Sequence, residues 1–318
     1  MDWIEEVFSL AQQGLFEGVM QPLMFWVGLG HLLEDGYAAA GWLLAGVIQL
    51  AVMLAVIGPL QRWRPVERPG DPVAIRTDVL YTLIHRLGLF RVALFFSVEP
   101  LFDEVFGALH VAGYGAFHLD RLWSPWVESA LFTFCVYLVV FDFADYWIHR
   151  AQHRFEWWWR LHSLHHAQRH MTMWSDHRNH LLDDVVRDSL LVVLAQVIGV
   201  APGQFVAIVA VTQLSESLQH ANVRLWFGRL GERIWVSPRF HRLHHAVGIG
   251  HESAGAGTLG GHNFGVLLPW WDVLFRTGNF ELRFDPTGVR DQVEGGRDYG
   301  RGFWSQQWLG IKRLVGRA

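Results

Sequence analysis

The chain has 318 residues and a formal net charge of −4, with 51% hydrophobic and only 18% charged residues. Its mean hydropathy is +0.18, which is unlike an ordinary soluble domain, and no broad basic surface is available for nucleic acid. The single cysteine, Cys135, excludes an internal disulfide framework and a cysteine-based metal site. Its apolar neighbours predict a buried, inert thiol. The acidic start, "MDWIEEVFSL", argues against a cleaved secretory signal.

Four segments are candidates for membrane spans, which need about 20 mostly apolar residues. The first, residues 18–33, is short and can also lie at the membrane interface, and the second, residues 41–60, carries no charge. The third, residues 79–101, is more polar, and the fourth, residues 127–144, is charged only at its ends. Residues 189–214 are apolar but broken by "GVAPG" at 199–203. This break predicts two half-length helices in a hairpin that dips into one leaflet, or else a buried core hairpin of a soluble protein.

Loop charges predict the orientation of these spans. Arginines concentrate in 61–78 and in 149–180, which we therefore place on the cytoplasmic side, whereas the more acidic 102–126 fits the far side. The predicted fold is an all-α, polytopic membrane helical bundle. It has about four spans plus a re-entrant or interfacial hairpin, with both termini and the histidine region in the cytoplasm. Three regions are expected: N-terminal anchoring helices (1–126), a region that carries most of the histidines (127–280) and a cytoplasmic tail (281–318).

The histidines cluster in the second half of the chain. Only His31, His85, His110 and His118 precede residue 149, and the others lie between His149 and His262. "HRAQH" separates His149 and His153 by four residues, and "HSLHH" and "HRLHH" both have the spacing i, i+3, i+4. Residues three and four apart share one helix face, so each group can direct its imidazoles at one point.

Metal binding explains this concentration of imidazoles. Neutral buried imidazoles need partners for their lone pairs and protonated ones repel each other, and a metal ion resolves both problems. The number of candidate ligands exceeds the four that zinc takes and the six of iron, which predicts two ions. Imidazole suits zinc, iron, copper and nickel, so ligand type alone does not select the metal. Asp142, Asp145, His149 and His153 form one helical stripe, in which the carboxylates either orient the ligands or cap a helix at the membrane edge.

These motifs resemble the fatty acid hydroxylase/sterol desaturase superfamily of integral membrane di-iron enzymes. Its pattern of HxxxH, HxxHH and a distal HxxHH matches His149/His153, His162/His165/His166 and His241/His244/His245. The family's N-[YF]-G element corresponds to Asn263-Phe264-Gly265, and its W-D-x-x-F-x-T element to "WDVLFRT" from Trp271 to Thr277. The resemblance covers about Asp142 to Thr277, under half of the chain.

The resemblance implies a membrane-bound, O2-dependent enzyme with two iron ions, or zinc as a substitute, that hydroxylates or desaturates a lipid. It implies these metal ligands: His149, His153, His162, His165, His166, His180, His220, His241, His244 and His245. Asp142, Asp145, Asn263 and Asp272 are expected to support the site, and no catalytic residue is expected beyond the metal centre. No Gly-rich dinucleotide fingerprint follows a strand, so a separate ferredoxin, cytochrome or reductase is expected to supply electrons. The expected location is the bacterial inner membrane, or the endoplasmic reticulum of a eukaryote.

Two departures from the family pattern concern access to the site. The segment 246–262 is longer and richer in glycine than expected for the family, which fits a mobile lid or a plain surface loop. Arg276 stands where the family often has glycine.

Three other classes of protein stay open at this point: a b-type cytochrome, a membrane zinc hydrolase and a non-enzymatic metal-binding protein. The first would place histidines in pairs within the bilayer. The second would need a base beside the ligands, for which Glu216 has a suitable spacing from His220.

Overall fold

The structure, a computed structural model, describes residues 2–68, 70–123, 129–247 and 261–317. These residues form helices and turns but no β-strand, which confirms the all-α prediction. The α-helices are α1 (Asp2–Leu15), α2 (Gln21–Trp26), α3 (Leu33–Val52), α4 (Gly58–Trp63), α5 (Pro72–Arg86), α6 (Leu89–Ser97), α7 (Glu99–Val111), α8 (Ala130–Arg154), α9 (Glu156–His166), α10 (Leu181–Ile198), α11 (Pro202–His220), α12 (Gly228–Gly231), α13 (Pro238–His244), α14 (Trp270–Leu274), α15 (Arg290–Val293) and α16 (Phe303–Leu314). Short π-helical or 3-10 segments are Phe16–Met20, Gly30–Leu32, Met53–Ile57 and Leu119–Trp123.

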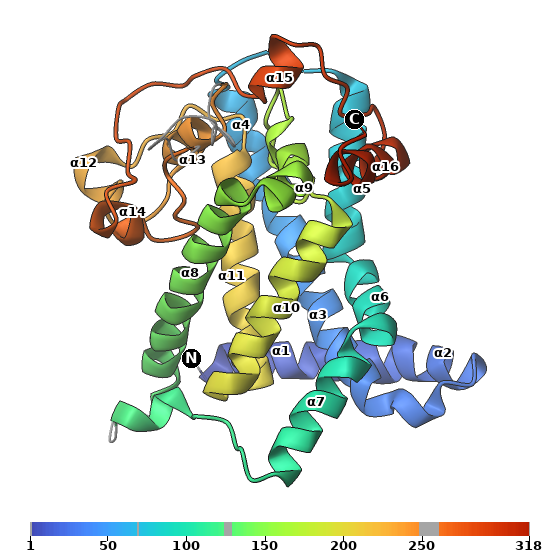
Figure 1. Cartoon of the computed structure of the whole chain (residues 1–318). Helices are drawn as coiled ribbons and strands as arrows, with labels where there is room; N and C mark the ends of the chain where they lie inside the picture. Colours follow the sequence, from blue (N-terminus) through green and yellow to red (C-terminus); the bar gives the residue numbers. More distant parts are fainter. Residues whose placement is uncertain (1, 69, 124–128, 248–260, 318) are drawn as a thin grey trace.

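The long helices run side by side and carry a helical cap. In Figure 1, α3, α8, α10 and α11 form the body of the bundle, and α9 and α12 to α16 lie at its upper end. Buried Tyr137, Phe141, Leu191 and Ile208 form an apolar cluster between α8, α10 and α11. The cap therefore sits on a rigid apolar stem, and the ends of α8 and α11 reach into it.

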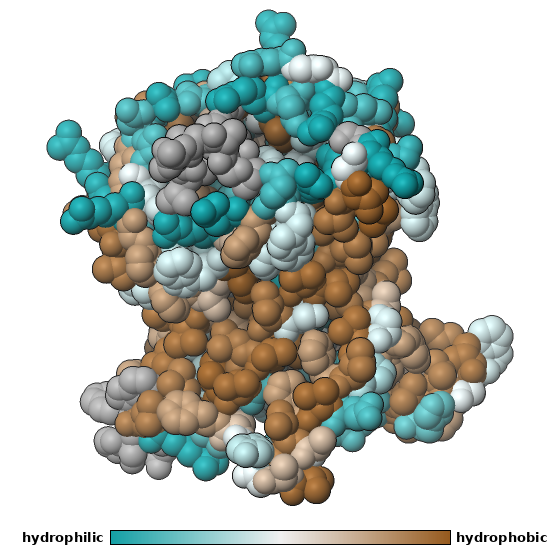
Figure 2. Space-filling view, in the orientation of Figure 1, coloured by the Kyte–Doolittle hydropathy of each residue, from teal (hydrophilic) through white to brown (hydrophobic). Residues whose placement is uncertain are grey.

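The stem has the apolar surface of a membrane protein. Two helical stretches, Gly30–Trp63 and Ala130–Arg154, are long and apolar enough to cross a bilayer. The pair α5 and α6 makes a third candidate if its 54° bend lies within one span. Hydrophobic residues cover the lower part of the molecule, whereas hydrophilic residues cover the cap (Figure 2).

The segment 18–33, also predicted as a candidate membrane span, is not one straight helix. It is divided among a π-helical turn, α2 and a 3-10 turn, because Pro22 begins a new helical segment and Gly28 adopts a positive φ of 80°. Helices α1 and α2 lie across the lower end of the bundle (Figure 1). The first helix thus lies at the end opposite α16, which differs from the predicted placement of both termini on one side.

The hairpin predicted at 189–214 is present but longer than expected. Helix α10 has 18 residues and α11 has 19, so each is roughly 27 Å long at about 1.5 Å per residue. Gly199 ends α10 with a left-handed φ of 71°, and Pro202 stands at the start of α11, where its missing N–H has no cost.

The prediction that Cys135 is buried is wrong, because this residue is exposed on α8. An apolar sequence around a residue indicates a buried position only in a water-soluble fold. On a helix long enough to cross a membrane, an apolar face also fits contact with lipid.

Candidate metal centre

Four helices bring their histidines together in the cap. The chain reverses at Phe155, whose extended backbone (φ −94°, ψ 120°) ends α8 and starts α9. This turn places HxxxH and the first HxxHH against each other, with ring centroids of His149 and His162 5.4 Å apart. Helix α13, started by Ser237 as N-cap and by Pro238, presents the second HxxHH. The C-terminal residue of α11, His220, completes the set.

The imidazoles form two groups of four. In each group one nitrogen per residue lies within 4.8 Å of the others, and every member is buried. The first group is His149, His153, His162 and His166, and the second is His165, His220, His241 and His245. A further set, His166, His244 and His245, meets the same criterion and links the two groups. The groups are adjacent, because the rings of His166 and His245 stack with centroids 4.2 Å apart.

In the second group the Nε2 atoms converge. The Nε2 of His220 lies 3.2 Å from that of His165 and 3.1 Å from that of His241, and the Nε2 of His245 lies 3.0 Å from that of His241. The Nδ1 of His220 lies 2.8 Å from the carbonyl oxygen of Glu216. Because a carbonyl only accepts, the proton of neutral His220 is on Nδ1 and its Nε2 presents a lone pair. One cation at the centre of such a group satisfies lone pairs that the neighbouring imidazoles cannot all satisfy.

Hydrogen bonds to Nδ1 also fix the tautomer of histidines in the first group. The Nδ1 atoms of His149 and His162 donate to the carbonyl oxygen of Phe264 and to Oδ2 of Asp183, both at 2.9 Å. Asp183 is itself held, because it also accepts from Gln152 and Trp158. Ligating histidines characteristically donate their second nitrogen to such groups, which fixes the tautomer and the ring orientation.

Several buried ring nitrogens in the two groups have no hydrogen-bond partner among the described residues. They include Nε2 of His162, Nε2 of His244 and both ring nitrogens of His166. His244 has its Nδ1 2.8 Å from the carbonyl oxygen of His262, so its Nε2 also presents a lone pair. A buried polar atom without a partner has a large desolvation cost. The donor set therefore fits metal ions that accept these lone pairs.

Burial keeps the groups in their neutral, metal-binding form. Desolvation lowers the pKa values of His165, His166, His241, His244 and His245 well below their usual range, and the neighbouring imidazoles lower them further. At neutral pH these side chains are uncharged and available as ligands.

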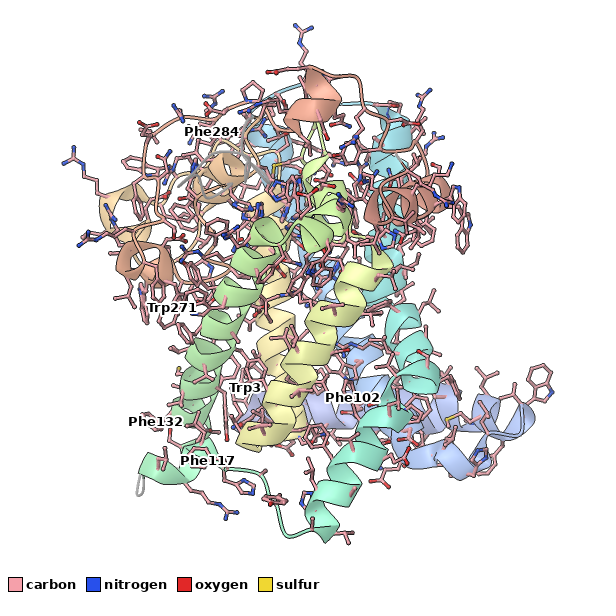
Figure 3. All side chains as sticks on the ribbon, viewed as in Figure 1. Trp3, Phe102, Phe117, Phe132, Trp271 and Phe284 are labelled. Atoms are coloured by element: carbon pink, nitrogen blue, oxygen red, sulfur yellow. The ribbon has the colours of Figure 1, made fainter. Side chains whose placement is uncertain are left out.

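On α8 the two carboxylates expected to support the site bind groups other than imidazoles. Asp142 accepts hydrogen bonds from the amides of Leu267 and Leu268 and from the indole of Trp271, which lies beside α8 (Figure 3). Asp145 forms no hydrogen bond with His149; it pairs with Arg187 at 2.9 Å. Ligand orientation is instead provided by Asp183 and by backbone carbonyl groups.

Asp272 and Asn263 fix the segment that supplies Phe264. Asp272 accepts from the amides of Phe264 and Gly265, and the side-chain amide of Asn263 donates to the carbonyl oxygen of Phe240 on α13. Asn263 adopts a positive φ of 63°, which asparagine tolerates better than most residues. These two residues connect the loop to the helix that carries the second HxxHH.

The remaining histidines lie outside the two groups. The ring nitrogens of His180 face the carbonyl oxygen of Gln307 and the amide of Leu182, so this residue caps α10 and contacts α16. His177 is buried and stacks on His85, with centroids 4.7 Å apart. His170 is exposed near Glu67. His251 and most of the glycine-rich stretch, 248–260, lie outside the described residues.

The segment that carries the two histidine groups resembles a known protein family. The sequence model of the fatty acid hydroxylase family matches residues 134–277, which include every histidine of the two groups. Over these residues, which are under half of the chain, the sequence is similar to the fatty acid hydroxylase superfamily. The family segment thus coincides with α8, α9, the α10–α11 hairpin, α13 and α14, which together build the candidate metal centre.

Two curated relatives of this fatty acid hydroxylase-like chain act on lipids. An ornithine lipid hydroxylase of Rhizobium tropici is 27% identical over 226 residues, which are 70% of this chain and 64% of that protein. An alkylglycerol monooxygenase of Caenorhabditis elegans is 25% identical over 165 residues, 51% of this chain and 30% of that protein. The matches span less than two thirds of each relative. No solved structure matches the chain.

Proposed function

We propose that the chain is a membrane-bound, di-iron, O2-dependent lipid hydroxylase or desaturase. The match of residues 134–277 to the fatty acid hydroxylase family and the two buried histidine groups support this function. The relatives are named for hydroxylation of an ornithine lipid and monooxygenation of an alkylglycerol, which supports a lipid as the substrate class. Two iron ions would supply O2 activation and attack on an unactivated C–H bond.

The proposed ligands are the histidines that converge in the cap. They are His149, His153, His162, His165, His166, His220, His241, His244 and His245. His180 is left out of the ligand set, because both of its ring nitrogens face other hydrogen-bonding groups. Asp183 and the carbonyl oxygens of Phe264, Glu216 and His262 would hold the imidazoles in their ligating tautomers.

The protein contributes positioning and the exclusion of water. Trp159 and Phe264 pack on His153, with ring centroids 5.0 and 5.3 Å apart. These aromatic rings cover the first histidine group, whose members are all buried. An apolar surrounding strengthens electrostatic interactions at the centre and protects reactive species from side reactions.

The cap, which carries the histidines and many arginines, is proposed to face the cytoplasm in agreement with the positive-inside rule. Helices α3, α8 and the bent pair α5–α6 would cross the bilayer, and the α10–α11 hairpin would enter it from the cap side. Residues 127–280 would form the catalytic domain, with 1–126 as anchor and 281–318 as tail. A separate ferredoxin, cytochrome or reductase would deliver electrons to the cap.

The observation that carries this proposal is the pair of adjacent, buried, all-histidine groups. The test is lipid profiling by mass spectrometry of cells with and without the gene, grown under 18O2. A product that gains labelled oxygen indicates hydroxylation, and a product that loses two hydrogens indicates desaturation. Zinc as the bound metal, together with lipid hydrolysis that is independent of O2, would contradict the proposal.

A further inference from the structure

A large cavity lies inside the apolar stem, between α3, α6, α7, α8, α10 and α11. Its volume is about 430 Å³, within the range of roughly 300–1,000 Å³ typical of small-molecule sites. Most of its lining is apolar, including Leu94, Phe95, Leu191 and Ile208. These dimensions and this chemistry fit a lipid chain.

Charged residues line the cavity at both ends. Near the histidines the lining includes Asp145 and Arg187, and Asp145 lies one helical turn before His149 on α8. At the other end, near Met24 and Phe102, the charged lining residues are the carboxylates Asp35 and Glu99, and Phe102 lies near the lower end of the bundle (Figure 3). Because only the end near the histidines offers both cationic and anionic side chains, a zwitterionic headgroup fits that end.

Four charged residues in the cavity wall lack a partner of opposite charge in contact with them. They are Arg91 of α6, the only cation of this set, and the carboxylates Asp35, Glu99 and Asp188, and none of them forms a hydrogen bond or ion pair with a residue that the structure describes. Asp188 of α10 is the carboxylate of this set on the helix that also carries Asp183. The guanidinium of Arg91 instead covers the ring of Trp42 at 3.4 Å. By contrast, neighbouring Arg187 is paired with Asp145 at 2.9 Å.

Unpaired charges at this depth require an explanation. Ionisable groups in the apolar part of a membrane protein are costly, face cavities or the bundle interior, and mark ligand sites. The carboxylate whose charge acts most strongly on Arg91 is Asp188, followed by Glu99. Arg91 and Asp188 thus interact across the cavity without touching, which leaves room for a group that carries both charges.

We propose that Arg91 and Asp188 bind the headgroup of a zwitterionic lipid in this cavity. Arg91 would hold the phosphate or carboxylate of the headgroup in a bidentate hydrogen-bonded pair, and Asp188 would accept from its ammonium group. The acyl chain would extend toward Met24 and Phe102. This inference rests on the proposed function for its consequence, but not for the binding site itself.

A headgroup bound by Arg91 and Asp188 would determine which part of the lipid is oxidised. Asp188 follows Asp183, the partner of His162, by five residues on α10, about 7–8 Å along the axis at about 1.5 Å per residue. A headgroup held there places the carbons next to it nearer to the histidines than the end of the acyl chain. Oxygen should therefore enter at the polar end of the lipid.

Binding is tested on delipidated, metal-loaded protein in detergent, by native mass spectrometry without O2 or reductant. The probes are dioleoylphosphatidylethanolamine and N-α-oleoyl-lysine, which are zwitterions with and without phosphate, dioleoylphosphatidylglycerol, which is anionic, and dioleoylglycerol, which is uncharged. At least one zwitterion should bind the native protein most tightly, and comparison of the two identifies phosphate or carboxylate as the anionic group. Equal binding of all four probes would overturn the proposal.

Substitutions of Arg91 and Asp188 test whether each side chain binds the headgroup. Arg91→Gln and Asp188→Asn should each weaken binding of the preferred zwitterion by at least about tenfold, as expected for a lost charged hydrogen bond. Arg91→Lys, which keeps the charge, should retain the preference. Glu99→Gln removes another carboxylate from the same cavity and is the matched control. Native affinity in Arg91→Gln, or an equal loss in Glu99→Gln, would show that the site is wrongly assigned.

Turnover separates this inference from the proposed function. Iron content and O2 uptake are measured on the same samples, so a protein without either contradicts the proposed function while the binding result stands. In an active protein, tandem mass spectrometry of the 18O-labelled product should place the label on the headgroup or the adjoining carbons. A label near the end of the acyl chain would overturn the orientation proposed here.

Discussion

At the scale of single residues, His220 shows how an imidazole is prepared for a metal. Its Nδ1 donates to a carbonyl oxygen one turn earlier on the same helix, and its Nε2 points at the Nε2 atoms of His165 and His241. The helix therefore fixes both the tautomer and the direction of the lone pair. His162 reaches the same state through the carboxylate of Asp183.

Removal of one ligand in the second group should empty that group selectively. His241→Ala leaves three imidazoles there, so we expect the iron content to fall from about two ions per chain to about one or fewer. Metal content measured by mass spectrometry checks this. His170→Ala, which removes an exposed histidine outside both groups, is the control. Undiminished iron in His241→Ala would contradict the ligand assignment.

Loss of the charge on Asp183 should weaken metal binding without removing a ligand. Asp183→Asn keeps the size of the side chain but no longer provides a carboxylate for the Nδ1 of His162. We expect a loss of roughly 10–100-fold in metal affinity, as is typical for residues that orient a ligating histidine. Competition with a chelator measures it, with exposed Asp103→Asn as control. Equal affinities in both variants would show that Asp183 has no orienting role.

At the scale of elements, the stem depends on close helix contacts. Helix α3 approaches the end of α5 so closely that a Cβ atom on Gly46 would lie 1.7 Å from the carbonyl oxygen of Arg86. A backbone atom cannot move aside as a flexible side chain can. Arg86 in turn donates to Asp176, Gln213 and Ser217, so this contact joins α5 to α11 and to the loop before α10.

Gly46→Ala should therefore destabilise the stem by about 1–3 kcal/mol, the usual cost of overpacking a core. The midpoint of thermal unfolding in detergent measures this. Gly18→Ala is the control, because a Cβ atom there meets nothing within 4 Å, and an added methyl group in a helix is neutral or favourable. The same midpoint in both variants would contradict the close packing of α3 on α5.

The segment from Asn263 to Thr277 depends on α8 through Asp142. In Asp142→Asn one carboxylate oxygen becomes an NH2 group, which faces the amide donor of Leu267 if it replaces Oδ1, or both Leu268 N and Trp271 Nε1 if it replaces Oδ2. We expect a loss of about 1–3 kcal/mol, the cost of leaving buried donors unsatisfied. Thermal unfolding measures it, with exposed Asp298→Asn as control. If the two variants unfold alike, Asp142 does not hold this segment.

At the scale of the whole molecule, local spacing in the sequence predicted helical histidine motifs, and the structure brings their rings together. The i, i+3, i+4 patterns require only that each segment is a helix, and α9 and α13 are helices. His180 shows the limit of such reasoning. It lies near the first HxxHH in the sequence, but its ring points to α16, and only the packing of the C-terminal helix decides this.

Long-range pairing was not predictable in the same way. Asp183, Asp184 and Asp188 are indistinguishable by sequence, yet the phase of α10 directs Asp183 to His162, Asp184 to His85 and Asp188 to the cavity. The carbonyl oxygen of Phe264, which orients His149, carries no side-chain signal at all. Apolar composition likewise identified the long helices but not the division of residues 18–33, which depends on Pro22 and Gly28.

For the whole molecule we propose that two adjacent all-histidine groups hold two iron ions, which oxidise a lipid with O2. The most direct measurement combines the iron content of the purified protein with 18O2 incorporation into lipid by the same sample, supplied with a reductant. We predict about two iron ions per chain and labelled or desaturated lipid only when O2 is present. Zinc in place of iron, or a lipid product formed equally without O2, would contradict the claim.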